Sequence, residues 1–374
     1  MAFKKKGKAT EAEIARKRYM RKKFFSDKVW PVARFIILFC LCFVILYPII
    51  YMLSTAFSPQ AEMDDPTRIW IPKQVTFSNI VDAFNAMKYP QTLGFTVLVN
   101  IVSAFLSVIS CAIAGYGFAR FKFKLKGVFF GIVVLMVLVP PQILFLQQSD
   151  QFKHFPLAAI IFLAIMFVVV LLTFKFVGQT NISNKGLFAI CAVEIVLAIA
   201  VAAIMVNLKI GQISLTNTPF VMYLPAITAS GLRAGLFIFI FRQFFKGLPK
   251  ELEDAAYLDG CSPLKTFLVV MVPNAVSSFI TVFLFAIVWY YNDTYTLPMF
   301  YSADATTKTI SMKISDVGTT MITYLYGKSD SALLGDVFVW IEAASLLAMF
   351  PIILLYIFLQ KYFTEGIERS GLVG

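Results

Sequence analysis

The sequence predicts an all-α polytopic membrane protein that crosses the bilayer about eight times. Of its 374 residues, 59% are hydrophobic and 14% are charged, and the mean hydropathy is +0.79. Soluble domains carry about 25% charged residues, so this chain is too apolar to be one. Its apolar residues gather in long runs separated by polar segments, which is typical of membrane-spanning helices.

The chain begins with a basic segment, residues 1–29, which holds eleven lysines and arginines against three acidic residues. The apolar run from about Val32 to Leu53 is long enough to span a bilayer, and no clear small-residue cleavage site follows it. We therefore expect a cytosolic N-terminal segment and an uncleaved first helix. Four prolines between residues 58 and 91 indicate a structured outer loop.

Two further spans complete the first part of the chain, residues 30–150. The span from about Gly94 to Phe118 carries a polar stripe on one helical face, made of Asn100, Ser103, Ser107 and Ser110. Such a stripe lines a solvated pathway or, more commonly, packs against another helix through hydrogen bonds. A loop with four positive charges, residues 120–126, precedes the third span, residues 128–146, which contains Pro140-Pro141.

Residues 151–215 add a pair of apolar runs, 157–177 and 187–206, that form a predicted transmembrane hairpin. Because a pair of spans returns the chain to the side from which it started, the topology downstream is unchanged. The remaining part, residues 216–374, contains spans at about 221–241, at about 267 or 274 to 291, and at about 337–359, followed by a polar tail.

A polar interval, residues 247–273, separates two of these last spans. Pro249 suits the first turn of a helix, Gly260 suits its end, and Ser262-Pro263 suits the start of a second helix that continues straight into the next apolar run. The pattern predicts helix, sharp turn, helix. Its small residues allow close approach by a partner and its charged residues offer polar contacts: Ala255 and Ala256, with Lys250, Glu251, Glu253 and Asp254. An ordinary solvated loop is the alternative.

The spacing of this interval resembles a known motif. Asp254-Ala255-Ala256, Gly260 and the stretch Val270-Met271-Val272-Pro273 are similar to the EAA loop in permease subunits of binding-protein-dependent ABC importers, in the carbohydrate-uptake branch of the maltose type. The sequence departs from that pattern at Asp254, where Glu is usual, and at Cys261, where Ala is usual. The resemblance implies a six-helix permease core. Residues of about 150–215 lie outside it, so the hairpin is expected to be an insertion.

The resemblance also implies roles and partners. The loop would be the coupling helix, which sits in a groove of a cytosolic ATPase, with these coupling residues: Glu253, Asp254, Ala255, Ala256, Asp259, Gly260 and Pro273. The expected partners are a second homologous permease subunit, two ATPase subunits or domains, and an extracytoplasmic substrate-binding protein. The chain contains no GxxxxGK[ST] phosphate loop, so ATP hydrolysis is assigned to partners, and no enzymatic activity or cofactor is expected.

The distribution of positive charge predicts the orientation without reference to the family. The N-terminus, residues 120–126, 179–186 and 242–266 and the C-terminal tail together hold 22 lysines and arginines, against 8 in the other loops. The positive-inside rule places these segments, including both termini, in the cytosol. The net charge of +12 therefore indicates a membrane orientation and not nucleic-acid binding.

A second candidate site follows the aromatic end of the span near residue 291. The stretch Trp289-Tyr290-Tyr291-Asn292-Asp293 resembles the aromatic-Asn-Asp pattern of sugar permeases. Flat aromatic faces and a few polar groups suit a polyhydroxylated solute. An interfacial aromatic belt is the alternative. Together with this stretch, a hydrated route for solute would be framed by Asn100, Ser103, Ser107, Asn274, Ser278 and Thr281.

Several residues leave the sequence analysis with more than one interpretation. Arg233 lies within a predicted span, where it either pairs with Glu342 or faces the pathway. A sugar or oligosaccharide is the expected cargo, and a polyol or glycerol phosphate is the alternative. An ion-coupled secondary transporter would use Glu194 or Glu342, but it leaves the EAA loop unexplained. A single histidine and five cysteines without paired spacing predict neither a metal site nor disulfides.

Overall fold

The computed structural model describes residues 11–63, 65, 71–139, 148, 150–177, 184–302, 305, 307–326 and 334–371. Within these residues the regular structure is helical, with one isolated antiparallel bridge between Phe155 and Ile213, which confirms the predicted all-α class. The chain divides into two compact units, Met1–Ala86 with Val317–Leu347 and Met87–Asp316 with Ala348–Gly374. Pro140-Pro141 lies outside the described residues.

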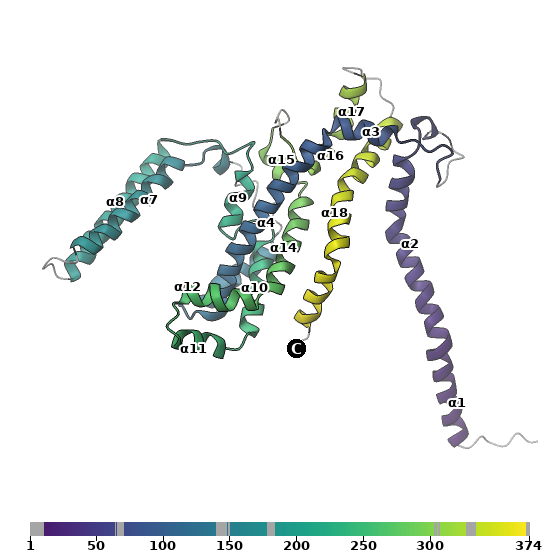
Figure 1. The fold of residues 1–374 in the computed structure, drawn as a ribbon, viewed down its shortest axis with the longest axis horizontal. Coiled ribbons are helices and arrows are strands. Elements are labelled where there is room, and N and C mark those ends of the chain that lie inside the picture. Colours follow the sequence, from purple (N-terminus) through teal and green to yellow (C-terminus); the bar gives the residue numbers. More distant parts are fainter. Residues whose placement is uncertain are drawn as a thin grey trace, which may run out of the picture. The chain divides into compact units, whose positions relative to one another are not determined.

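The first unit contains the predicted first span. Helix α1 (Glu11–Phe24), a π-helical turn (Phe25–Val29) and α2 (Trp30–Ala56) follow one another without interruption, and a 3₁₀ turn (Gln60–Glu62) follows (Figure 1). Helix α3 (Ser78–Ala86) packs against α17 (Val317–Tyr326). The Asn79 amide donates to the carbonyls of Ala56 and Ser58 at 3.1 and 2.7 Å, which ties α3 to the end of α2. Helix α18 (Leu334–Gly371) begins in this unit and ends in the other.

The core of the second unit is a packed group of helices. It consists of α4 (Tyr89–Arg120), α5 (Lys126–Leu138), α9 (Phe220–Ile227), α10 (Ala234–Gly247) and α14 (Val276–Tyr291) (Figure 1). Glycines let α10 approach its neighbours: a Cβ on Gly115 would lie 2.6 Å from the Phe241 Cβ, and one on Gly235 would lie 2.8 Å from the Val133 carbonyl oxygen. Small residues at helix contacts are typical of membrane bundles, where close packing supplies the attraction.

Shorter helices extend this unit at both ends of the group. Helix α11 (Glu251–Leu258), α12 (Pro263–Thr266), a π-helical turn (Phe267–Met271) and α13 (Val272–Asn274) connect α10 to α14. Helix α15 (Thr296–Phe300) and α16 (Ile310–Ser315) follow α14. The backbone N–H of Ile310 donates to the Thr96 hydroxyl at 2.9 Å, so α16 is held to α4.

The predicted hairpin is present as two long helices, α7 (Leu157–Val177) and α8 (Asn184–Asn207), which pack along each other (Figure 1). The turn between them, residues 178–183, lies outside the described residues. The bridge between Phe155 and Ile213 joins the segment before α7 to the segment after α8 at the open end of the hairpin. Most side chains of both helices are apolar and exposed, as lipid-facing helices require.

Two predicted continuous spans are interrupted, which corrects the sequence analysis. The expected span 221–241 is divided into α9 and α10 by residues 228–233. The Thr228 hydroxyl donates to the Leu224 carbonyl at 3.1 Å, and the Ser230 N–H donates to the Pro225 carbonyl at 2.9 Å, so local polar groups satisfy the end of α9. Ser and Thr compete with helical hydrogen bonds in this way.

The second interruption lies between α13 and α14, where the predicted straight continuation from Pro263 is wrong. Residues Pro263–Asn274 and Val276–Tyr291 meet at an angle of 80°. Pro273 has no N–H to continue the helical ladder, and the Asn274 side chain donates to the Val270 carbonyl at 2.7 Å. By length and composition, five described helices suffice to cross a membrane, or six if this bent pair is one span. The total of eight spans stays a prediction.

Candidate functional site

The interval 247–273 forms the helix-turn-helix that its sequence predicts. Helix α11 ends at a Schellman turn, in which the Cys261 N–H donates to the Ala256 carbonyl at 2.9 Å and the Gly260 N–H donates to the Tyr257 carbonyl at 3.0 Å. Gly260 has a φ of +76°, which glycine adopts without strain. The Ser262 hydroxyl then accepts from the Lys265 N–H at 3.3 Å and caps α12.

The inner face of α11 is fixed to α4 by a buried polar cluster. The Glu253 carboxylate lies 3.3 Å from Arg120 Nε and accepts a hydrogen bond from the Tyr116 hydroxyl at 2.9 Å. Arg120 also donates to the Leu248 carbonyl at 2.7 Å, which anchors the segment before α11. The Arg120 and Glu253 side chains are 7% and 10% exposed. This burial makes loss of either partner costly, because the remaining charge would be left without compensation.

Aromatic rings surround the cluster. The Tyr116 ring packs at 4.9 Å from the Phe267 ring and 5.5 Å from the Phe245 ring. Phe267 follows α12 and Phe245 belongs to α10, so three segments converge on the residue that binds Glu253. The loop is therefore packed against the ends of α4 and α10 through Tyr116 and the two rings around it.

The outer face of α11 and α12 is exposed and includes large apolar side chains. Leu258 is 89% exposed and Leu264 is 69% exposed, and Tyr257 and Ala255 are also on the surface. Asp254, Asp259 and Gly260 are exposed beside them, as is Pro273. Ala256 and Glu253, by contrast, are buried within the chain. The small surface expected from both alanines is thus divided, with Ala255 outward and Ala256 inward, and the Glu253 charge is used internally.

The polar stripe of α4 is buried except at Ser110, which is half-buried, and the structure brings part of it to the aromatic stretch of α14. The Ser107 and Tyr290 hydroxyls are 2.8 Å apart, and the Ser110 hydroxyl donates to the Ala226 carbonyl of α9 at 2.5 Å. Asn100 and Ser103 differ from these. Both residues are at most 2% exposed. Within the described part of the chain, the amide nitrogen and oxygen of Asn100 and the hydroxyl of Ser103 have no hydrogen-bond partner.

The expected pathway residues of α13 and α14 do not share one environment. Ser278 and Thr281 are buried, and Thr281 donates to the Ser277 carbonyl at 2.9 Å. Asn274 is exposed at the bend, where its amide bonds to the backbone. The structure therefore places Asn274 in the bend and does not group it with Asn100.

Asp293 is a helix cap. Its carboxylate is 6% exposed and accepts from the backbone N–H groups of Thr296 and Leu297 at 2.8 and 3.1 Å, at the start of α15. The neighbouring Asn292 is exposed. An aspartate shortly before a helix is a residue type that favours such capping of backbone N–H groups.

Arg233 and Trp289, predicted separately, lie together. The Arg233 guanidinium carbon is 4.1 Å from the centre of the Trp289 ring, a cation–π contact. Arg233 has a φ of +59° and stands at the break before α10, not inside a continuous helix. Glu342 belongs to the other compact unit, and its pairing with Arg233 stays a prediction.

Comparisons with known proteins identify the family. Residues 107–369 match the family described as the binding-protein-dependent transport system inner membrane component. The arabinooligosaccharides transport system permease protein AraQ of Halalkalibacterium halodurans is 26% identical, over 89% of this chain and 93% of that protein. The lactose transport system permease protein LacG of Rhizobium radiobacter is 24% identical, over 79% of this chain and 80% of that protein.

A third relative and a solved structure agree. The melibiose/raffinose/stachyose import permease protein MelC of Bacillus subtilis is 22% identical, over 87% of this chain and 90% of that protein. A chain in the crystal structure of a bacterial ABC transporter that imports the acidic polysaccharide alginate has a TM-score of 0.57 at 16% identity, over 90% of this chain and 98% of that chain. That likeness shows the fold. Because the family match covers more than half of its length, the chain belongs to the inner membrane components of binding-protein-dependent transport systems, as the resemblance predicted.

Proposed function

We propose that the chain forms half of the translocation pathway of an ATP-driven importer for a sugar or oligosaccharide, and that residues 247–273 couple it to a cytosolic ATPase. A second homologous permease would complete the pathway, and a substrate-binding protein would deliver solute to the outer face. The asymmetry of positive charge supports a cytosolic position for this loop and for both termini.

The observation that carries the proposal is the two-sided character of α11 and α12. Their inner side is held by Glu253, Arg120 and Tyr116, whereas their outer side presents Leu258 and Leu264. Exposed leucines beside a rigid turn favour a protein partner, because burial of each would contribute about 1.5–3 kcal/mol. The exposed Asp254 and other acidic groups around them would give that contact its polar rim.

The same packing suggests how coupling proceeds. Closure of the ATPase would move α11, and the buried pair between Glu253 and Arg120 would pass that movement to α4. Helix α4 also carries Asn100 and Ser103, the buried polar groups without partners in the described chain. We place the solute pathway along this face of α4, where solute hydroxyls or water would satisfy them.

The cargo proposal rests on relatives named for arabinooligosaccharides, lactose, melibiose, raffinose and stachyose. Trp289 supports it, because an indole face suits the C–H surface of a sugar ring. In this chain Arg233 covers that ring, so a solute would reach Trp289 by its edge or by displacing Arg233. Tyr290 would contribute to the pathway by positioning Ser107 through their hydrogen bond. Asp293 would contribute by holding the start of α15 in place.

The coupling proposal is tested by Leu258→Asp in the importer reconstituted with its partner subunits in proteoliposomes. We expect solute-stimulated ATP hydrolysis and ATPase copurification to fall at least tenfold, because a charge would enter the docking contact. The matched control is Leu125→Asp, which changes another exposed leucine in the 120–126 loop. Normal ATP hydrolysis in Leu258→Asp would show that the ATPase does not bind this face.

The cargo proposal is tested by uptake of labelled lactose, raffinose and arabinotriose, with glycerol 3-phosphate and a polyol such as sorbitol in parallel. Uptake of at least one of the three sugars, dependent on ATP and on the binding protein, is the expected result. Preferential uptake of sorbitol or glycerol 3-phosphate would replace the sugar assignment by the alternative that the sequence left open.

A further inference from the structure

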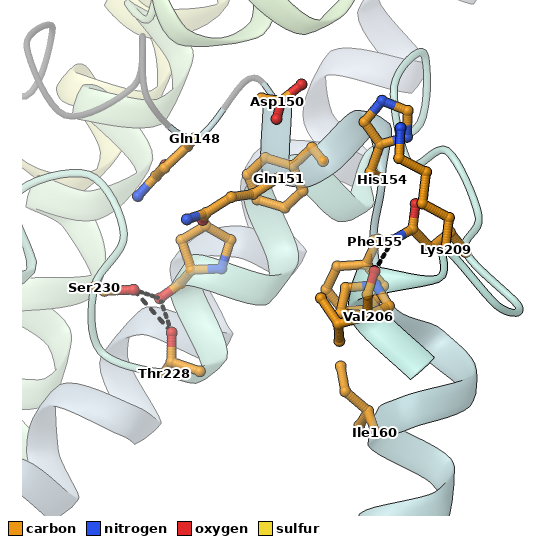
Figure 2. Close-up of a pocket in the computed structure, with 14 residues that line it drawn as sticks. Gln148, Asp150, Gln151, His154, Phe155, Ile160, Val206, Lys209, Thr228 and Ser230 are labelled. Atoms are coloured by element: carbon orange, nitrogen blue, oxygen red, sulfur yellow. Dashed lines mark hydrogen bonds between the residues drawn. The ribbon is translucent and has the colours of Figure 1, made fainter. Parts of the chain in front are cut away.

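A cavity of about 680 Å³ lies where the open end of the α7–α8 hairpin meets the end of α9 (Figure 2). The two helices and the turn after α8 supply Ile160, Val206, Lys209 and Gln212. The chain before α7 supplies Gln148, Asp150, Gln151, Phe152, His154, Phe155 and Pro156. Pro225, Thr228 and Ser230 come from α9 and the break that follows it. Its volume falls within the range of about 300–1,000 Å³ that is typical of small-molecule sites.

Gln148 and Gln212 line this cavity, and their amide oxygens are buried without a hydrogen-bond partner in the described part of the chain, so each amide must turn for its oxygen to face a ligand. The Gln212 orientation is set locally, because its Nε2 donates to the Val206 carbonyl at 3.2 Å and leaves Oε1 as the unsatisfied acceptor. A buried acceptor without a donor costs about 1–3 kcal/mol. Both oxygens are therefore suited to groups that donate hydrogen bonds.

Hydroxyl groups and a balanced pair of charges complete the polar part of the lining. The Thr228 and Ser230 hydroxyls are 2.8 Å apart, and Figure 2 shows them on the same side as the Gln148 and Gln151 amides. Asp150 and Lys209 provide one negative and one positive charge. Apart from His154, the lining therefore carries no net charge. Its amides and hydroxyls suit a neutral ligand with many hydroxyls better than an anion.

The rest of the lining is apolar. It includes the Phe155 ring, Pro156 and Ile160 at the start of the hairpin. These surfaces match the C–H faces of a pyranose or furanose ring, which alternate with hydroxyl edges around the same molecule. The cavity thus combines the two kinds of contact that a sugar presents.

The position of the cavity is also informative. Helix α7 has 21 residues, which at 1.5 Å per residue corresponds to about 30 Å, the thickness of the hydrocarbon core. The cavity therefore lies about one bilayer thickness from the hairpin turn. Given the orientation in the proposed function, on which this step rests, the cavity opens on the outer side, where solute arrives.

We infer that the hairpin and α9 form a binding site for a neutral oligosaccharide at the outer entrance of the pathway. Gln148 and Gln212 accept hydrogen bonds from sugar hydroxyls, and Thr228 and Ser230 contribute further hydroxyl contacts. The hairpin thereby adds a solute contact to the permease core, separate from the pathway along α4.

The test measures direct binding of raffinose and arabinotriose by saturation-transfer NMR. The purified, assembled importer is used in nanodiscs without the binding protein. We expect the double variant Gln148→Met and Gln212→Met to weaken binding at least tenfold, because methionine keeps the length of the side chain and removes the acceptors. The matched control is Gln243→Met, the same change at an exposed glutamine of α10 outside the cavity. The control is expected to bind as the wild type does.

Three results would overturn the site: no binding of either sugar to the wild type, equal binding by the double variant, or tighter binding of trigalacturonate than of the neutral sugars. ATP-driven uptake by the wild type is measured separately. If sugar binds and depends on the two glutamines but no sugar is transported, the cavity site stands and the proposed function fails. If sugar is transported and the double variant binds normally, the proposed function stands and the cavity site fails.

Discussion

The helix-turn-helix loop, residues 247–273, and the hairpin, residues 151–215, have different surroundings, which constrain their side chains to different degrees. In the loop, the buried Glu253 carboxylate must find partners, which Arg120 and Tyr116 of α4 supply, and a turn of positive φ favours glycine. In the most apolar stretches of α7 and α8, only 6% and 17% of the residues are buried, against 44% in the corresponding stretch of α4. A lipid-facing helix needs only to be apolar, so its side chains are constrained much less.

This contrast has a consequence for recognition from sequence. A segment fixed by specific contacts keeps residue types at fixed spacing, and the loop therefore carries a motif. A segment whose solvent is lipid keeps only hydropathy. The hairpin shows a candidate site only at its open end, where the folded chain places Gln148, Gln212 and Thr228 around one cavity.

The largest effect on the loop is expected at the buried ion pair that joins Glu253 to Arg120 of α4. Arg120→Met should destabilise the protein by about 3–5 kcal/mol, because Glu253 would remain buried with an uncompensated charge. Thermal unfolding of the purified protein and solute-stimulated ATP hydrolysis measure the two consequences. Lys122→Met, at an exposed position of the same segment, is the control. Equal unfolding temperatures of the two variants would mean that the pair does not hold α11.

A smaller effect is expected at the turn. Gly260→Val should lower the free energy of unfolding by about 1–2 kcal/mol, because a branched side chain disfavours the left-handed backbone. No steric clash adds to this, because a Cβ at this position meets no atom within 4 Å. Membrane insertion should be normal, and stimulated ATP hydrolysis and uptake should be lost because the Schellman turn is distorted. Gly260→Asn is the matched variant, since asparagine tolerates this conformation. A Val variant with normal transport, or an Asn variant as impaired as Val, would contradict the role given to the turn.

The smallest effect is expected in the hairpin. Phe167→Ala on α7 should change stability by less than about 0.5 kcal/mol, because its side chain is 63% exposed and loses few protein contacts. Phe237→Ala on α10, which is fully buried, should cost about 3–5 kcal/mol by the same measurement. Comparable losses in the two variants would show that α7 packs against protein in the assembled importer.

The sequence by itself determined the features that depend on composition or on local backbone chemistry. Apolar length predicted α2, α4, α7, α8 and α18, because a bilayer imposes length and hydropathy on any helix that crosses it. Local signals predicted the loop, since Gly260 and Ser262-Pro263 act through their own backbone. Fixed spacing in the same loop predicted the family, which the match over residues 107–369 confirms.

Only the tertiary structure decided how polar residues are used. Glu253 and Arg120 are separated by more than one hundred residues, and Arg233 and Trp289 by more than fifty, so no local pattern could join them. Asp293, which the sequence offered as a solute contact, binds backbone N–H groups at the start of α15, and its contact with solute stays a prediction. The breaks near Ser230 and Ala275 have the same origin: hydroxyl, proline and amide groups open a helix only where the folded chain around them supports the change of direction.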